Sequence, residues 1–341
     1  MSQEFPSQNF APQPVGPAAC RVCGHRDGNH RHTAREMMFG RRDRFDYVEC
    51  AGCGCLQIET IPHNLGDYYG PDYYSISGDL DQEFASKEKK RRHGLRARLL
   101  LSLPDLLAKR VRFADMRRPL WSLRRALPSR RGRILDVGCG AGRLLYLLSL
   151  AGWRRGYGVD PFLPEDLCYA NGLKVQRGSL DEVEGGWDLI MFHHSFEHVP
   201  DPLASLRAAA QRLTRTGTCV LRIPVADCEA WRRYGADWVQ LDAPRHLHLF
   251  TRKSIEILAA QAGLRVVGVA HDSYEIQFWG SEQYRRDIPL FAEGSFRWGN
   301  GAPIFSPAQI KQWQQESERL NRAGAGDQAV FYLKPDAPRR G

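Results

Sequence analysis

The stretch ILDVGCGAGRLL, from Ile134 to Leu145, decides the fold of this chain. Its apolar beginning predicts a buried strand, its alternate glycines predict a tight turn, and its Arg-Leu-Leu end begins a helix. Without Cβ atoms at Gly138, Gly140 and Gly142, the turn lets a ligand approach the backbone, and the helix start offers free N–H groups to an anionic group. The stretch therefore predicts a ligand-binding turn at the carboxyl edge of a parallel sheet.

Six further apolar runs follow this strand and alternate with helical patterns. Together the seven read RILDVG, YGVDP, LKVQRG, WDLIMFHH, TCVLRIP, RVVGVAH and QAVFYLKP. Strands that alternate with helices predict an α/β fold built on a doubly wound, mostly parallel sheet of seven strands. At 341 residues the chain has room for this core and for a smaller appended module.

Two carboxylates beside the glycine turn indicate which ligand it holds. Asp136 stands just before the turn and can accept hydrogen bonds from an ammonium group, whereas Asp160 closes the next strand and can accept them from ribose hydroxyls. The spacing G-x-G-x-G also differs from the G-x-G-x-x-G of pyrophosphate-binding loops. The alternatives are an NAD-dependent oxidoreductase and glycines that only turn a strand into a helix.

With these features the chain resembles, from Arg133 to Pro335, the class I S-adenosylmethionine-dependent methyltransferases. The run WDLIMFHHSFEHVPDP at 187–202 strengthens the resemblance. It implies a Rossmann-like methyltransferase domain with S-adenosylmethionine as its cofactor. By resemblance, the cofactor contacts come from Asp136, Gly138, Gly140 and Asp160, with Ser179, Leu180 and His193 near the adenine and methionine ends.

Two runs of histidines follow the fourth and fifth strands, HHSFEH from His193 and DAPRHLHLF from Asp242. Both runs should lie above the carboxyl edge of the sheet, close to the cofactor. An attacking hydroxyl must lose its proton, and a histidine near neutrality can accept it. The alternatives are a helix-capping role for Glu197 and structural roles for the histidines, which include packing for His193 and His248 and stay open for His198 and His246. The predicted catalytic residues are His246, as the base, with His198, His194 and Glu197.

The combination of EHVPDP with PRHLHLF resembles a bacterial branch of the class I enzymes that modifies small molecules and sugars. Nucleotide-sugar methyltransferases of this branch carry an N-terminal zinc module, a polar residue four before a histidine in the first run, and Glu-His in the second. Those positions are His194, His198, Arg245 and His246 here, so an arginine replaces the glutamate. Carbon methylation by the sugar route thereby loses a carboxylate, and oxygen methylation is the prediction.

The same resemblance implies an acceptor site between the histidine runs and a tyrosine-rich stretch that follows the zinc module. Packing is the alternative role for most of these tyrosines. The expected acceptor contacts are Tyr68, Tyr69, Tyr73, Tyr74 and Arg245, and Trp238, Gln240 and Asp242 are expected to shape the pocket.

Two Cys-x-x-Cys-Gly turns lie near the start of the chain, 27 residues apart. Two such pairs, in a chain that shows no export signal, fit one tetrahedral structural zinc better than disulfides. The predicted zinc ligands are Cys20, Cys23, Cys50 and Cys53, with Cys55 as an alternative to Cys53.

The net charge of +9 is concentrated in residues 87–133, which carry 17 Lys or Arg against 3 Asp or Glu. Basic residues interspersed with Leu, Phe and Trp fit a solvated scaffold, an anionic lipid surface or a nucleic-acid backbone. The scaffold is the default, and an anionic membrane surface would suit a lipid-linked glycan acceptor. Without a signal sequence or a long apolar run, the protein is expected in the cytoplasm, at most peripheral to the inner membrane.

Two rival functions stay open. Some RNA methyltransferases also combine a four-cysteine zinc module with a basic surface, but Asn/Asp-Pro-Pro-Tyr would mark base-nitrogen chemistry where this chain has HHSFEH, so nucleic acid is the less favoured partner. The other rival is a cofactor-binding protein that has lost catalysis. The preferred acceptor is a sugar, glycan precursor or other small molecule, and the oligomeric state is not predicted.

The chain is expected to divide into a disordered tail (1–17), a zinc-binding module (18–60), a tyrosine-rich loop and basic helical bridge (61–130) and a methyltransferase domain (131–341).

Overall fold

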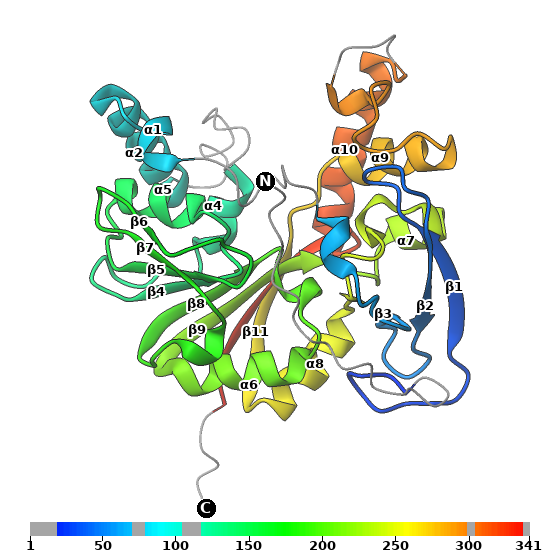
Figure 1. The fold of residues 1–341 in the computed structure, drawn as a ribbon, viewed down its shortest axis with the longest axis horizontal. Coiled ribbons are helices and arrows are strands. Elements are labelled where there is room, and N and C mark those ends of the chain that lie inside the picture. The colour runs from blue at the N-terminus through cyan, green and yellow to red at the C-terminus, as the bar shows by residue number, and fades with distance from the viewer. Residues whose placement is uncertain (1–18, 70–78, 104–116, 299–303, 337–341) are drawn as a thin grey trace, which may run out of the picture.

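The computed structural model describes residues 19–69, 79–103, 117–298 and 304–336 (Figure 1). The tail expected at 1–17 lies outside these ranges, as do Tyr73 and Tyr74.

The larger of two sheets has eight strands and carries the glycine turn. Its strands lie in the order β11 (Leu264–His271), β12 (Gln328–Pro335), β9 (Leu213–Pro224), β8 (Trp187–His193), β4 (Ile134–Val137), β5 (Gly156–Asp160), β7 (Lys174–Arg177) and β6 (Leu167–Cys168). All seven predicted apolar runs are strands of this sheet, in a doubly wound α/β arrangement.

The prediction of seven strands is corrected by the eighth, β6, which pairs antiparallel with β7 at the sheet edge. Its two residues, Leu167 and Cys168, are too short a run to form a recognisable strand pattern. The neighbours from β9 to β7 are all parallel, whereas β12 runs antiparallel between β9 and β11. An antiparallel strand beside an otherwise parallel sheet is common in doubly wound folds.

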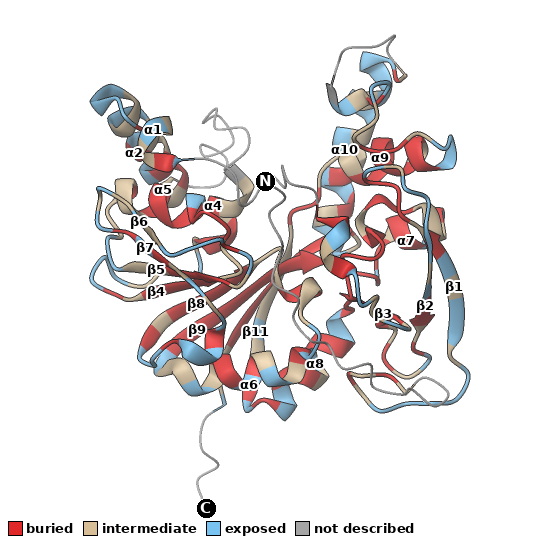
Figure 2. Cartoon of the chain, viewed as in Figure 1, coloured by how far each residue is buried: buried red, intermediate tan, exposed pale blue. Residues whose placement is uncertain are grey.

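Helices cover both faces of this sheet (Figure 1). Along β8, Ile190 and Phe192 enter one apolar cluster while Leu189 and Met191 enter the other, so the strand is buried on both faces (Figure 2). This explains its uninterrupted apolar sequence. One face is covered by α6 (Pro202–Arg212) and α8 (Arg252–Gln261), and the other by α2 (Lys87–Ser102), α4 (Arg117–Leu123) and α5 (Arg143–Ala151), with the short α1 (Leu80–Glu83) beside α2.

The smaller sheet joins the N-terminal module to the main domain. Its four strands are β1 (His30–Arg35), β2 (Arg44–Glu49), β3 (Leu56–Ile58) and β10 (His248–Leu249), in that order. The last strand belongs to the second histidine run and pairs antiparallel with β3. A third apolar cluster lies between this sheet and α7 (Glu229–Tyr234), α9 (Ile276–Arg285) and α10 (Pro307–Ala323). The N-terminal module therefore shares both a sheet and a core with the segment that carries His246.

Candidate active site

The glycine turn after β4 has the geometry that only glycine adopts without strain. Gly138, Gly140 and Gly142 have φ values of 70°, 54° and 79°. A Cβ at Gly138 would lie 2.4 Å from the Cβ of Ser195, so the turn is closely packed against the first histidine run. The Ser195 hydroxyl also donates a hydrogen bond of 2.6 Å to the Val137 carbonyl. The cofactor turn and the histidine run are thus held in fixed relation.

The two predicted carboxylates lie at this turn. Asp160 accepts hydrogen bonds from the Gly140 N–H (2.8 Å) and the Phe162 N–H (2.9 Å), which fix its carboxylate and leave lone pairs for ribose hydroxyls. Asp136 is buried, and its Oδ1 has no partner among the described residues. Burial, and then the charge of Asp160, raise the pKa of Asp136 well above its ordinary value. An orphaned carboxylate oxygen at a glycine turn fits the ammonium group of S-adenosylmethionine.

The residues expected near the two ends of the cofactor follow or end two strands, β7 and β8, which β4 and β5 separate in the sheet. Ser179 and Leu180 follow β7, where Ser179 caps a short turn, η2 (Leu180–Glu182). His193 ends β8, and its Nε2 is buried without a partner among the described residues. Burial, and then the charge of Arg222, lower the pKa of His193 well below its ordinary value, so this imidazole is neutral.

Three of the predicted catalytic residues meet in one cluster. Glu197 and His198, in the turn η3 (Phe196–His198), approach His246 so that one ligand-type atom from each lies within 4.8 Å of the others. The ring centroids of the two histidines are 4.8 Å apart. The structure therefore brings the two histidine runs together above the carboxyl ends of β8 and β9.

The tautomers of both histidines follow from their partners. Nδ1 of His198 lies 2.8 Å from the Arg245 carbonyl, and Nδ1 of His246 lies 2.7 Å from the Gln240 carbonyl. A carbonyl only accepts hydrogen bonds, so both Nδ1 atoms carry the proton and both Nε2 atoms present a lone pair when the rings are neutral. Burial, and then the charge of His246, lower the pKa of His198, which favours its neutral form.

Glu197 is the charged member of the cluster. Its side chain is fully buried, yet its pKa is lowered to about 2, because a hydrogen bond from His194 and the charges of nearby histidines outweigh the opposing effect of burial. Its Oε1 lies 3.2 Å from Nδ1 of His194 and 3.9 Å from Nε2 of His246. Its Oε2 is buried with no partner among the described residues. An ionised carboxylate thus faces the two imidazoles.

His194 differs in position from the other two histidines. Its Nε2 accepts a hydrogen bond of 2.6 Å from Arg222, so its Nδ1–H is free to donate to Glu197. Arg222, in β9, is itself buried and paired with Asp272 at 2.8 Å. The chain of contacts from Asp272 through Arg222 and His194 orients the Glu197 carboxylate.

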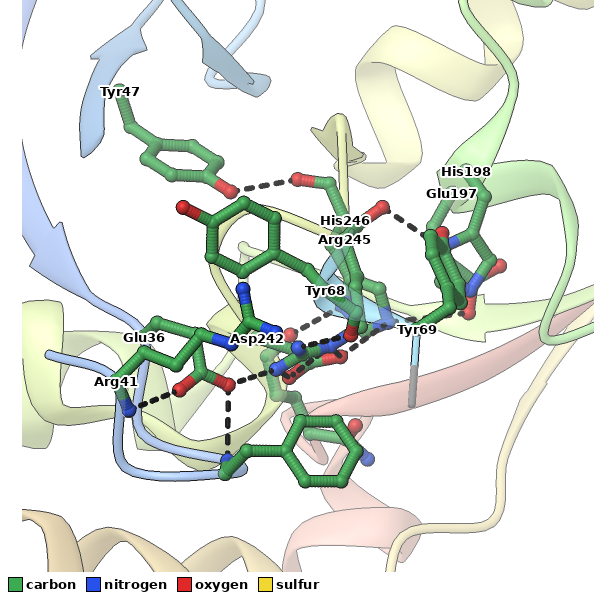
Figure 3. Close-up of polar contacts among 12 residues, drawn as sticks. Glu36, Arg41, Tyr47, Tyr68, Tyr69, Glu197, His198, Asp242, Arg245 and His246 are labelled. Atoms are coloured by element: carbon green, nitrogen blue, oxygen red, sulfur yellow. Dashed lines mark hydrogen bonds and ion pairs between the residues drawn. The ribbon is translucent and has the colours of Figure 1, made fainter. Parts of the chain in front are cut away.

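Arg245, which is expected to contact the acceptor, forms hydrogen bonds and ion pairs inside the protein. It is fully buried, and its guanidinium donates to Asp242, to Glu36 at 2.9 Å and to the Tyr68 carbonyl at 2.9 Å (Figure 3). Asp242 is 2.6 Å from it at the closest approach. With its side chain fully buried and these donors used inside the protein, Arg245 ties the N-terminal module to the histidine loop, and its contact with the acceptor stays a prediction.

Tyr69 connects the cofactor side with the histidine cluster. Its ring is stacked on Phe162, with centroids 5.5 Å apart, and Phe162 follows shortly after Asp160. Its hydroxyl lies 3.3 Å from Nδ1 of His198 (Figure 3). The hydroxyl of Tyr68 instead donates to Asp43 and points away from the cluster. Of the four predicted tyrosines, Tyr69 is thus the one that the structure places at the cluster, while Tyr73 and Tyr74 lie outside the described residues.

Several residues of the site carried too weak a sequence signal to be selected. Glu36 accepts from Arg245 and from the backbone N–H groups of Phe39 and Arg41, and Tyr47 bonds to the His246 carbonyl. Arg245 lies about 200 residues from Glu36 in sequence, and His246 lies about 200 residues from Tyr47, so no local pattern reveals Glu36 or Tyr47. Arg222 did carry a signal, because a charged residue within the apolar run TCVLRIP needs a buried partner.

The four predicted zinc ligands form the second cluster with metal-ligand spacing among the described residues. Sγ of Cys20 is 3.6 Å from Sγ of Cys53, and Sγ of Cys23 is 3.5 Å from Sγ of Cys50. A tetrahedral zinc with bonds of about 2.3 Å would separate its sulfur ligands by about 3.8 Å. The donor set and its dimensions therefore fit a structural zinc, and Cys55 stands outside the cluster.

The helices of the described residues include none that is both long and apolar enough to cross a membrane.

The sequence of residues 108–269 matches a family model described as a methyltransferase domain. Among curated proteins, the chain is 37% identical over 101 residues to a ubiquinone biosynthesis O-methyltransferase of Methylococcus capsulatus, covering 26% of this chain and 41% of that protein. It is 34% identical over 141 residues to the same-named protein of Xanthomonas campestris pv. campestris, covering 36% of this chain and 56% of that protein. The chain thus spans about half the length of these relatives or less.

Solved structures with lower similarity include the mitomycin 7-O-methyltransferase MmcR, at 13% identity and a TM-score of 0.39 over 78% of this chain and 69% of that chain. An O-methyltransferase from neocarzinostatin biosynthesis, NcsB1 in complex with S-adenosylmethionine and a naphthoic acid, has 15% identity and a TM-score of 0.35 over 60% of this chain and 49% of that chain. The family match and the curated relatives, together with the glycine turn and its carboxylates, show that residues 108–269 of this chain are similar to a methyltransferase domain, and they support the resemblance to the class I S-adenosylmethionine-dependent methyltransferases.

Proposed function

We propose that this chain transfers the methyl group of S-adenosylmethionine to a hydroxyl oxygen of a small-molecule acceptor, such as a sugar or a glycan precursor. The observation that carries the proposal is the cluster of Glu197, His198 and His246 beside the cofactor turn. A buried cluster in which two imidazoles can present Nε2 lone pairs beside a carboxylate is suited to removing a hydroxyl proton. The names of the curated relatives, ubiquinone biosynthesis O-methyltransferases, also support an oxygen acceptor.

The chemistry at the cluster follows from the tautomers. The bound cofactor supplies an electrophilic methyl group and a sulfonium leaving group. As the acceptor oxygen forms its bond to the methyl carbon, the carbon–sulfur bond breaks and its electron pair stays on sulfur. When no metal ion is bound to the cluster, the hydroxyl proton passes to Nε2 of His246. The carboxylates of Glu197 and Asp242, 3.9 and 3.8 Å from this nitrogen, stabilise the imidazolium that results.

The four-cysteine cluster has a structural part in this proposal. A zinc ion bound by Cys20, Cys23, Cys50 and Cys53 has no open position for a substrate. The Thr251 hydroxyl donates to the Cys53 carbonyl at 2.6 Å, so the zinc turn packs directly against the start of α8. Zinc would stabilise the module that supports the His246 loop.

The helix α2 is proposed as a contact to an anionic membrane surface. Its outer side carries the exposed residues Arg91, Arg92 and Arg98. Leu95 and Leu99 lie on the same side and are 59% and 37% exposed. Basic residues around two exposed leucines are typical of helices that lie on anionic lipid. Such a contact would suit an acceptor that is carried on a lipid.

The proposed reaction is tested by incubating purified protein with methyl-labelled S-adenosylmethionine and a fractionated bacterial extract. Label is expected in polar small molecules or lipid-linked material, in a bond that resists mild base as a methyl ether does. Label confined to RNA would overturn the proposed acceptor class. Tight cofactor binding with no label in any fraction would indicate a cofactor-binding protein without catalysis.

A further inference from the structure

The cluster at the centre of the proposed function has the ligand set of a metal site. We propose that Glu197, His198 and His246 bind a first-row divalent cation such as Mn²⁺ or Co²⁺, at a site separate from the four-cysteine cluster. The three side chains come from two segments that are almost 50 residues apart in sequence, yet their ligand atoms lie within 4.8 Å of one another. The inference rests on the proposed function only for the role of the ion, not for its binding.

Both imidazoles are oriented as metal ligands are. A ligating histidine usually donates its second N–H to a carbonyl or carboxylate, which fixes the tautomer and turns the other nitrogen toward the ion. His198 and His246 both do this, through Nδ1–H bonds of 2.8 and 2.7 Å to the carbonyls of Arg245 and Gln240. Their Nε2 atoms, which carry a lone pair, are left to bind the ion.

Glu197 supplies an independent observation. Its side chain is fully buried, and Oε2 has no hydrogen-bond partner among the described residues. A buried carboxyl oxygen without a partner is costly unless a bound group satisfies it. The other carboxyl group nearby, Asp242, is already paired with Arg245 at 2.6 Å, so Glu197 is the one left to bind an ion.

The ligand set also indicates the kind of ion and its use. Two imidazoles and one carboxylate suit Mn²⁺, Fe²⁺, Co²⁺ or Zn²⁺ better than Mg²⁺, which prefers oxygen ligands. Three protein ligands leave coordination positions open for an acceptor oxygen. A hydroxyl bound to such an ion loses its proton to solvent near neutral pH, because the cation lowers the pKa of that hydroxyl. The resulting oxygen anion attacks the methyl carbon, the carbon–sulfur bond breaks with its electrons on sulfur, and no oxidant or reductant is needed.

Direct binding is measured by titrating the zinc-containing, EDTA-treated protein with Mn²⁺ and following the free ion by electron paramagnetic resonance. The zinc content is determined before and after treatment, so that loss from the four-cysteine cluster is detected. The wild type is expected to bind one Mn²⁺ per chain. His246→Ala and Glu197→Gln should weaken binding at least ~10-fold. The matched control, His63→Ala, removes an exposed histidine outside the cluster and should bind as the wild type does.

Cofactor affinity is measured on each variant as a check of folding, and Co²⁺ absorption spectra of the unmutated protein provide a second readout if a variant does not fold. Visible bands of a nitrogen- and oxygen-ligated Co²⁺, without thiolate charge-transfer bands, would support the site. Absence of both Mn²⁺ binding and Co²⁺ bands in the wild type would overturn it.

Methyl transfer separates this inference from the proposed function. We expect transfer to fall at least ~10-fold after EDTA treatment and to return with Mn²⁺ or Co²⁺. Full transfer by metal-free protein would overturn the role of the ion and leave proton removal by His246. Metal binding without transfer to any extract fraction would support the site and contradict the proposed function.

Discussion

The hydroxyl of Tyr47, in the middle of β2, donates a hydrogen bond of 2.8 Å to the backbone carbonyl of His246. Together with the ion pair between Glu36 and Arg245, it attaches the N-terminal module to the loop that carries the proposed catalytic histidine (Figure 3). The module is therefore a support of the active site and not a separate appendage. The first two predictions below follow from this relationship.

Tyr47→Phe should lower the rate of methyl transfer several-fold and leave cofactor affinity unchanged. The substitution removes one buried hydrogen bond and leaves the His246 carbonyl without its partner, which should cost about 1 to 3 kcal/mol of stability. Steady-state kinetics and urea unfolding of the same preparations measure the two effects. A variant with wild-type turnover would show that the hydrogen bond does not position His246.

Cys20→Ser combined with Cys50→Ser should lose zinc and, with it, most of the methyl transfer. The reason is that the zinc turns hold β3, and β3 pairs with β10 directly after His246. Element analysis and turnover are measured together. Cys168→Ser, which alters an exposed cysteine outside the cluster, is the control and should retain both zinc and activity. Zinc-free protein with full activity would contradict the supporting role.

Asp327→Asn should make the protein more stable at alkaline pH. Burial raises the pKa of Asp327 from 3.8 to about 6, against the hydrogen bonds from Trp238 and Ser273. The folded protein therefore holds this proton more tightly than the unfolded chain, so stability is lost as pH rises from about 4 to about 6.

Since two pKa units correspond to about 3 kcal/mol, the variant should exceed the wild type by up to that amount at pH 8 and match it near pH 4. Urea unfolding of both proteins at the two pH values gives the difference, in which groups common to both cancel. An equal difference at both pH values would mean that Asp327 ionises normally.

Arg91→Glu with Arg92→Glu should reduce co-sedimentation with vesicles that contain anionic lipid, because both side chains lie on the exposed side of α2. The matched control, Arg215→Glu with Lys253→Glu, makes the same change in net charge at exposed residues outside α2. The control should bind as the wild type does. If neither the wild type nor the control variant binds such vesicles at low salt, α2 is a scaffold and not a membrane contact.

The strands could be predicted from the sequence because short runs rich in apolar residues alternate with helical patterns, and all seven predicted runs form strands. The glycine turn could be predicted equally well, for two reasons. Positive φ values near 70° favour glycine, and a ligand can approach the backbone closely where side chains are absent. By contrast, β6 has two residues and pairs only at the edge, so it leaves no periodic signal. The antiparallel direction of β12 depends on where α10 ends in space, which local sequence does not encode.

The site was predictable where residues cluster in sequence and not where the fold assembles them. His198, Glu197 and His246 stand in two conspicuous runs, and the structure brings them together. The role of Arg245 could not be read from its position in the second run, because its partner Glu36 lies more than 200 residues away. The contact between Arg222 and His194 depends on the pairing of β8 with β9, so the sequence indicates that Arg222 needs a buried partner but not which residue that partner is.

The most direct test of the central claim is the rate of methyl transfer by His246→Ala, measured beside its affinity for S-adenosylmethionine. If the cluster ionises the acceptor hydroxyl, turnover should fall about 100-fold or more, while cofactor affinity stays within about twofold of the wild type. Asp160→Ala should show the opposite pattern, with weakened cofactor binding. Turnover by His246→Ala equal to that of the wild type would contradict the claim that this cluster carries the chemistry.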